Sequence, residues 1–194
     1  MNHRTQQLKV LSAGVLSLIL TMGVARFAYT PMLPIMQEQA GLGVSEGVWL
    51  AATNYLGYLA GALVASMISD LVLKDRLYRI GLLVAVLTTA GMGLTDNVWL
   101  WSLLRFLAGL STAAGMLLGS GLIMNWLIRH NHRAELGVTF FGVGLGMVLC
   151  AVAVELMSTF LSWNDQWLVL TLIGGLIMIL AWRWLPPPST ALLD

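Results

Sequence analysis

Charged residues are scarce in this sequence. Only 10% of its 194 residues are Asp, Glu, Lys or Arg, whereas 58% are hydrophobic, and the mean hydropathy is +0.84. A water-soluble domain carries about 25% charged residues and about 45–50% apolar ones. So few charges could not cover the surface of a soluble domain of this size, and the composition therefore indicates a membrane protein.

Cysteine and histidine are also rare, and this excludes several kinds of chemistry. Cys150 is the single cysteine, so no disulfide can form within the chain. All three histidines lie outside the apolar runs, so Ser120 in "LLGSGL" has no neighbouring base for nucleophilic catalysis. "RHNHR", residues 129–133, lacks the thiol or carboxylate cluster of a zinc site. With no glycine-rich nucleotide loop either, we expect no enzyme activity, no cofactor and no metal.

Long apolar runs are what the sequence has in abundance. A helix that crosses a bilayer needs about 20 mostly apolar residues. Six runs fit this requirement: Leu8–Ile35, Val48–Ser69, Tyr78–Leu94, Val98–Ile128, Leu136–Leu161 and Trp167–Leu185. The first run continues past Arg26 without a small-residue cleavage site, which favours a retained helix over a signal peptide. We predict an all-α membrane protein with six transmembrane helices in residues 1–185, and the start of a cytoplasmic linker or tail in residues 186–194.

The basic residues outside the spans are distributed asymmetrically. Eight of the ten lie at alternate ends of the spans: Arg4, Lys9, Lys74, Arg76, Arg79, Arg129, Arg133 and Arg183. The loops at the opposite ends, 37–47, 95–97 and 162–166, contain no Lys or Arg. The positive-inside rule assigns the basic side to the cytoplasm. We therefore predict a multi-pass protein of the cell inner membrane with both termini in the cytoplasm.

The other two basic residues, Arg26 and Arg105, lie inside predicted spans. An arginine at the centre of a membrane helix costs about 2.5–3.5 kcal/mol on insertion scales, so neither is expected to face lipid. At 1.5 Å per residue, Arg105 lies about 10 Å from the outer end of its span and Arg26 about 15 Å. Asn54 and Tyr55 lie at a depth of about 10 Å in the second span. Polar groups from several helices are therefore expected to meet in the outer half of the bilayer.

Two interpretations of the arginines stay open. Both could be structural, by bonding backbone carbonyls or by pairing with Glu155. Alternatively, they could line a cavity for an anion or another polar solute. The candidate substrate-cavity residues are Arg26, Tyr29, Asn54, Tyr55 and Arg105. Glu155 is the only carboxylate well inside a predicted span, which makes it the candidate for proton coupling.

Two motifs resemble those of the major facilitator superfamily (MFS). In that superfamily a Gly-xxx-Asp-Arg-x-Gly-Arg-Arg loop joins helices two and three. The stretch "SMISDLVLKDRLYR" is similar, although Ser66 replaces the leading glycine and the spacing after the aspartate is longer. "RFLAGLSTAAG" resembles the Arg-xxx-Gly motif of helix four. The resemblance implies one half, a 3+3 inverted repeat, of an MFS-type fold. It also implies a conformational-switch loop with Asp70, Lys74, Arg76 and Arg79.

Three longer runs resemble the YbfB/YjiJ family within this superfamily: "GVARFAYTPMLP", "WLAATNYLGYLAGAL" and "FFGVGLGM". The resemblance implies a transporter class and no particular substrate. It also implies that helices one and four line the central cavity, that two and five meet the other half, and that three and six face lipid.

A complete transporter of this kind has two halves with the site between them, whereas this chain stops at "LPPPSTALLD". We predict the truncated N-terminal half of a secondary transporter for a small polar solute, with an anion favoured. The alternatives are a homodimer and a non-transporting membrane subunit that needs a partner. The expected partners are the lipid bilayer, the solute, and a second six-helix half or a second copy; no nucleic acid is expected.

Overall fold

The computed structural model describes residues 2–188, and within this range every regular element is helical. In chain order these elements are α1 His3–Leu18, η1 Ile19–Phe27, α2 Tyr29–Gln39, α3 Val44–Ser66, α4 Leu71–Leu94, α5 Val98–Ala113, η2 Ala114–Leu118, α6 Gly119–Arg129, α7 Gly137–Met157 and α8 Trp163–Trp184. The elements η1 and η2 are π-helical. α1, η1 and α2 form one continuous span, and α5, η2 and α6 form another, so six helices are long and apolar enough to cross a membrane. The predicted all-α, six-span fold is confirmed.

Several helix boundaries differ from the predicted ones. α4 begins at Leu71 and not at Tyr78, because the Asp70 carboxylate caps it by accepting the Val72 N–H at 3.1 Å. α7 ends at Met157, four residues before the predicted end. α8 ends at Trp184, and most of the predicted linker, residues 186–194, lies outside the described residues.

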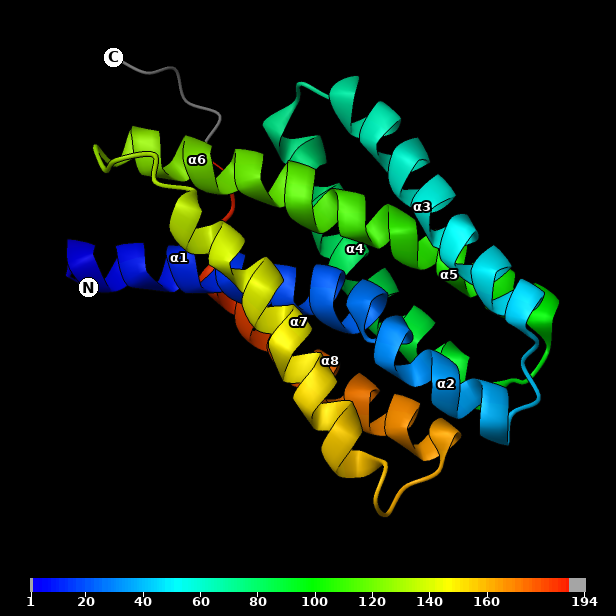
Figure 1. Cartoon of the computed structure of the whole chain (residues 1–194). Helices are drawn as coiled ribbons and strands as arrows, with labels where there is room; N and C mark the ends of the chain where they lie inside the picture. Colours follow the sequence, from blue (N-terminus) through cyan, green and yellow to red (C-terminus); the bar gives the residue numbers. More distant parts are fainter. Residues whose placement is uncertain (1, 189–194) are drawn as a thin grey trace.

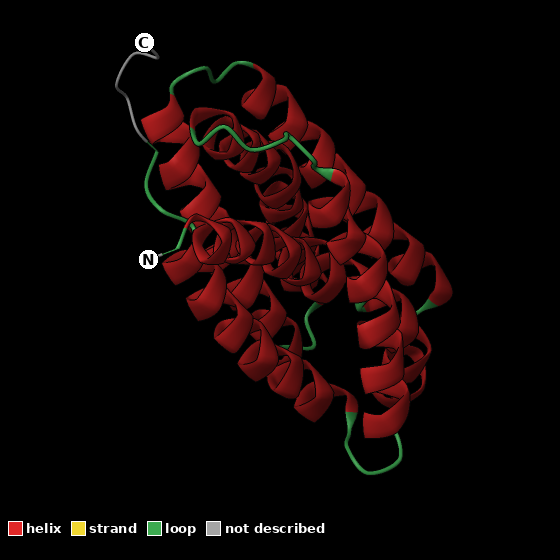
Figure 2. Cartoon of the chain, turned by 90° about the vertical axis from the view of Figure 1, so that its left-hand side faces the viewer, coloured by secondary structure: helices red, strands yellow, loops and turns green. Residues whose placement is uncertain are grey.

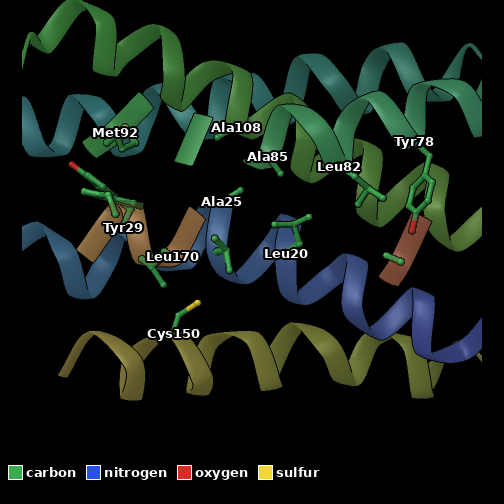
Figure 3. Close-up of a cluster of buried hydrophobic side chains, with 14 of the residues drawn as sticks. Leu20, Ala25, Tyr29, Tyr78, Leu82, Ala85, Met92, Ala108, Cys150 and Leu170 are labelled. Carbon is green, nitrogen blue, oxygen red and sulfur yellow. The ribbon is translucent and has the colours of Figure 1, made fainter. Parts of the chain in front are cut away.

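The first span lies at the centre of the bundle. In the most apolar 18-residue stretch of the first span, 67% is buried. The corresponding buried share is 22% in α3 and 22% in α8. The first span contacts α4 and α5 as well as α7 and α8, and α7 crosses in front of it in Figure 1. Figure 2 shows the same helical bundle from the side. Figure 3 shows the core beside it, where Leu20, Ala25 and Tyr29 of the first span meet Ala85 of α4 and Cys150 of α7. The central position means that residues of this span touch several other helices.

Glycines set the closest helix contact. A Cβ added to Gly57 of α3 would collide with the Phe106 carbonyl of α5, and one added to Gly109 of α5 would collide with the Asn54 carbonyl of α3. Small residues let membrane helices approach until their backbones touch, and van der Waals contact then holds them together. Gly57 and Gly109 therefore have a packing role.

A glycine in the left-handed backbone conformation follows the end of the first span. Gly41 has φ +71° and no atom within 4 Å of where its Cβ would be. This conformation lets the Leu42 N–H bond the Met36 carbonyl, six residues back, at 3.3 Å. The chain reverses here and begins α3 beside the end of α2.

The six-span fold makes the predicted orientation testable. In a Cys150→Ala background, the single variants Glu46→Cys, Asp96→Cys and Asp165→Cys place a thiol on exposed residues in or next to one set of loops. We expect an impermeant thiol reagent to label all three from outside intact cells, because these loops lack the basic residues that stay in the cytoplasm. Arg76→Cys and His130→Cys, also at exposed positions, should react only after the cells are opened. Labelling of these two in intact cells would reverse the orientation.

Candidate functional site

The site begins in the π-helical segment η1 of the first span. Its wider register is visible in the bond from the Ala28 N–H to the Gly23 carbonyl, five residues back, at 2.8 Å. π-Helical turns are rare and often occur at functional sites. Two carbonyls of η1 accept hydrogen bonds from side chains of α5: Thr112 donates to Thr21 at 2.9 Å, and Arg105 donates to Ala25. The fourth span therefore holds the first along this segment.

Arg105 is buried and held by the protein. Its side chain is only 3% exposed, and Nη1 donates to the Ala25 carbonyl oxygen at 3.1 Å. The guanidinium lies over the ring of Tyr29, 4.3 Å from the ring centroid. Tyr29 in turn donates its hydroxyl to the Gly47 carbonyl at 2.7 Å. Nε of Arg105 is buried without a hydrogen-bond partner, so one donor remains for a group that is not part of this chain or for water.

Asn54 links α3 to the same point of α5. It is 1% exposed, and its Nδ2 donates to the backbone carbonyl of Arg105 at 3.0 Å. The bond is possible because Gly57 and Gly109 bring the two backbones into contact next to it. Asn54 therefore fixes the position of the arginine through the main chain rather than through the guanidinium.

Arg26 is in a different environment. It is half-buried, and its guanidinium lies over the rings of Tyr55 at 4.7 Å and Tyr58 at 5.0 Å, with Phe27 at 5.7 Å. Its guanidinium forms no hydrogen bond or ion pair with residues 2–188. Tyr58 was not among the predicted site residues; its place three residues after Tyr55, on one face of α3, was the available signal.

The predicted cavity residues meet around one small cavity. Arg26, Tyr29, Asn54, Tyr55 and Arg105 all line it, together with Phe27, Thr30 and Ala51. Its volume of about 40 Å³ is room for a few water molecules, whereas small-molecule pockets measure about 300–1,000 Å³. Two cations thus line one cavity within the span region, and neither forms an ion pair with an acidic group in residues 2–188.

Glu155 lies apart from this cluster. It is exposed in the last turn of α7, which ends two residues later, and it does not line the cavity. Within residues 2–188 the ion pairs are Arg79–Asp75 and Arg133–Glu135. The alternative in which the arginines pair with Glu155 is therefore wrong: α7 ends earlier than predicted, so Glu155 lies near the end of its span, where it is exposed. Its role in proton coupling stays a prediction.

The residues predicted as a switch loop are mostly helical. Asp70 caps α4, while Lys74, Arg76 and Arg79 lie on α4 itself. Describing these three as loop residues is therefore wrong, since the cap starts the helix early; their role as a switch stays a prediction. Arg79 is paired with Asp75 at 3.1 Å and donates to the Trp182 and Leu185 carbonyls, each at 2.7 Å. It thus joins the start of α4 to the end of α8.

Ser120 has a local hydrogen bond only. Its hydroxyl donates to the Met116 carbonyl, four residues back on the same helix, at 2.5 Å. Serine bonded in this way is common inside helices. The nearest histidine in sequence, His130, stacks on Trp126 at a ring distance of 4.1 Å. This arrangement agrees with a packing role for Ser120.

Six spanning helices with a buried polar cluster define a polytopic membrane protein of the transporter type. Residues 18–193 match the sequence profile of the family described as "Uncharacterised MFS-type transporter YbfB". Because the match covers most of the chain, the protein belongs to this family of MFS-type transporters. The predicted family is confirmed.

Individual relatives are more distant. The chain is 22% identical over 152 residues to the uncharacterized transporter mfc1 of Schizosaccharomyces pombe, covering 78% of this chain and 31% of that protein. It is 23% identical over 155 residues to the uncharacterized transporter YebQ of Escherichia coli, covering 80% and 34%. It is 26% identical over 170 residues to the efflux pump radE of Floropilus chiversii, covering 87% and 32%. The chain spans about a third of the length of these curated relatives.

Proposed function

We propose that this six-helix unit takes part in secondary transport of a small solute that carries a negative charge. The observation behind the proposal is that Arg26 and Arg105 line one cavity among the membrane spans without an acidic partner in residues 2–188. A cation in a membrane protein is tolerated where water or a counter-charge surrounds it. An anionic solute would supply that counter-charge, and the planar guanidinium matches the geometry of a carboxylate.

We further propose that a second six-helix unit completes the site. The cavity is too small for a solute as it stands, and the chain spans about a third of its relatives. α3 and α7 expose large hydrophobic side chains, which include Leu56 and Leu63 of α3 and Val148 and Leu156 of α7. Exposed apolar faces suit either lipid or the helices of a second unit. This second unit could be another polypeptide segment or a second copy.

The test is uptake into liposomes that contain the purified chain, with radiolabelled lactate and benzoate as probes and the uncharged benzamide as the comparison. We expect no saturable uptake by the chain alone, since the site is incomplete. When the chain is fused to the second six-helix half of a relative such as YebQ, we expect saturable uptake of the carboxylates above that of benzamide. Equal uptake of benzamide would contradict an anionic substrate. Saturable uptake by the chain alone would show that two copies are enough.

A further inference from the structure

The two arginines of the cavity differ in what their guanidinium groups are free to do. Arg105 is 3% exposed, bonded to the Ala25 carbonyl at 3.1 Å and covered by the ring of Tyr29. Arg26 is half-buried and in contact with aromatic rings, and its guanidinium bonds no polar atom of residues 2–188. Arg26 can therefore turn two adjacent N–H donors toward a solute without breaking a hydrogen bond, whereas Arg105 is buried and already bonded to the first span.

Contact with ring faces leaves the donors of Arg26 available. A guanidinium over an aromatic ring is attracted through the charge distribution of the ring, while its five N–H groups point outward in its own plane. Tyr55 lies 4.7 Å and Tyr58 5.0 Å from the guanidinium carbon. Both rings thus hold the cation in place, and neither occupies its donors. A carboxylate can then accept two parallel hydrogen bonds from one edge of the group.

The surroundings of Arg26 indicate what the rest of the solute should be. Its guanidinium contacts the rings of Phe27, Tyr55 and Tyr58, and Tyr55 is 58% exposed. Flat aromatic groups gain about 0.5–1.5 kcal/mol from ring contacts beyond their area burial. Of the polar side chains that line the cavity, Tyr29, Asn54 and Arg105 already donate to backbone carbonyls. Besides Arg26, this leaves the hydroxyls of Thr30 and Tyr55 as hydrogen-bonding partners for a polyhydroxylated solute.

Building on the proposed transport function, we propose that Arg26 is the residue that contacts the solute, and that the solute is a monocarboxylate with an aromatic or similarly flat apolar skeleton. A monocarboxylate fits because Arg105 is 3% exposed, bonded to the Ala25 carbonyl and covered by the ring of Tyr29, so it is not placed to receive a second carboxylate. Arg105 is a positioning residue that fixes η1, the segment carrying Arg26. Tyr55, whose ring is exposed, provides the stacking surface. Tyr58 is held by its hydroxyl bond to Met116 Sδ at 3.7 Å and supports the cation from the other side.

The test is ligand binding to the fusion of this chain with the second six-helix half of a relative, in lipid nanodiscs, because the cavity of the chain alone is too small for a solute. Binding is measured as the rise in unfolding temperature with ligand concentration, because a ligand that binds the folded state stabilises it. The probes are benzoate, its uncharged analogue benzamide, the polyhydroxylated carboxylate gluconate and the dicarboxylate phthalate. We expect benzoate to bind at least about tenfold more tightly than each of the other three.

Variants then assign the contact. We expect Arg26→Ala to abolish benzoate binding and Arg26→Lys to weaken it about tenfold, since an ammonium lacks the fork. Tyr55→Leu should weaken benzoate binding and leave gluconate binding unchanged. Arg183→Ala, which removes an exposed cation at the other end of the bundle, is the matched control and should bind benzoate as the wild type does.

The outcomes separate this inference from the proposed function. If gluconate or phthalate binds as well as benzoate, or if Arg105→Lys abolishes binding while Arg26→Lys does not, the inference is wrong and an anionic solute remains supported. If no carboxylate binds more tightly than benzamide, both the inference and the proposed anionic solute are wrong. If Tyr55→Leu binds benzoate like the wild type, the stacking surface is wrongly assigned.

Discussion

Gly109→Ala is expected to destabilise the six-helix unit by about 3 kcal/mol, near the upper end of the range for overpacking. The new Cβ would collide with the backbone of α3 at the Asn54 carbonyl and lie 2.6 Å from the Tyr58 nitrogen. Backbone atoms cannot rotate away as a flexible side chain can, so the two helices must separate. Separation would break the Asn54–Arg105 bond and lose the van der Waals contact that holds membrane helices together. Unfolding in a denaturing-detergent titration measures the loss.

Gly175→Ala is the matched control for this variant. Gly175 also lies inside a membrane helix, α8, but nothing lies within 4 Å of where its Cβ would be. The same substitution there should be neutral or stabilising by up to about 1 kcal/mol, since alanine is the better helix former. Equal stability of the two variants would show that α3 and α5 are not in backbone contact.

Arg105→Ala is expected to destabilise the fold by about 2 kcal/mol, whereas Arg26→Ala should cost below about 1 kcal/mol. Loss of Arg105 leaves the Ala25 carbonyl without its partner in an apolar region, and an unpaired buried acceptor costs about 1–3 kcal/mol. The arginine would lie in the bilayer in the separated helices as well as in the folded bundle. Removing its charge therefore changes the free energy of unfolding little. Arg26→Ala leaves no backbone acceptor unpaired, and the attraction of the cation to its rings is worth about 0.5–1 kcal/mol at a partly exposed site.

Thermal unfolding of both variants in detergent, alone and combined with Glu155→Gln, checks this expectation. Because Glu155 is exposed and outside the cavity, Glu155→Gln should not restore the stability of Arg105→Ala. If Glu155→Gln did restore the stability of Arg105→Ala, a buried Arg105–Glu155 ion pair would exist, contrary to the geometry. If Arg26→Ala proves as unstable as Arg105→Ala, both arginines are structural and the assignment of Arg26 to the solute fails.

The sequence by itself determined the class and span count of this protein. Apolar runs of about 20 residues and a one-sided distribution of Lys and Arg are local properties, and lipid leaves a polypeptide few ways to satisfy its backbone. The same reasoning singled out Arg26 and Arg105, since a cation in an apolar run is costly wherever the helix lies. It also predicted that Tyr29, Asn54 and Tyr55 belong near them, because depth along a helix follows from residue count.

Only the tertiary structure decided what each arginine touches. The contact depends on which helix faces meet and at what register, and that was set by Gly57 and Gly109 allowing α3 and α5 to touch. The π-helical register of η1, visible in the Ala28–Gly23 bond, changes which side of the first span Arg26 occupies. Glu155 was misjudged because the end of α7 depends on where the loop begins, four residues before the apolar run ends. Helix rotation and register are properties of packing between distant segments, so a linear pattern of apolar residues does not specify them.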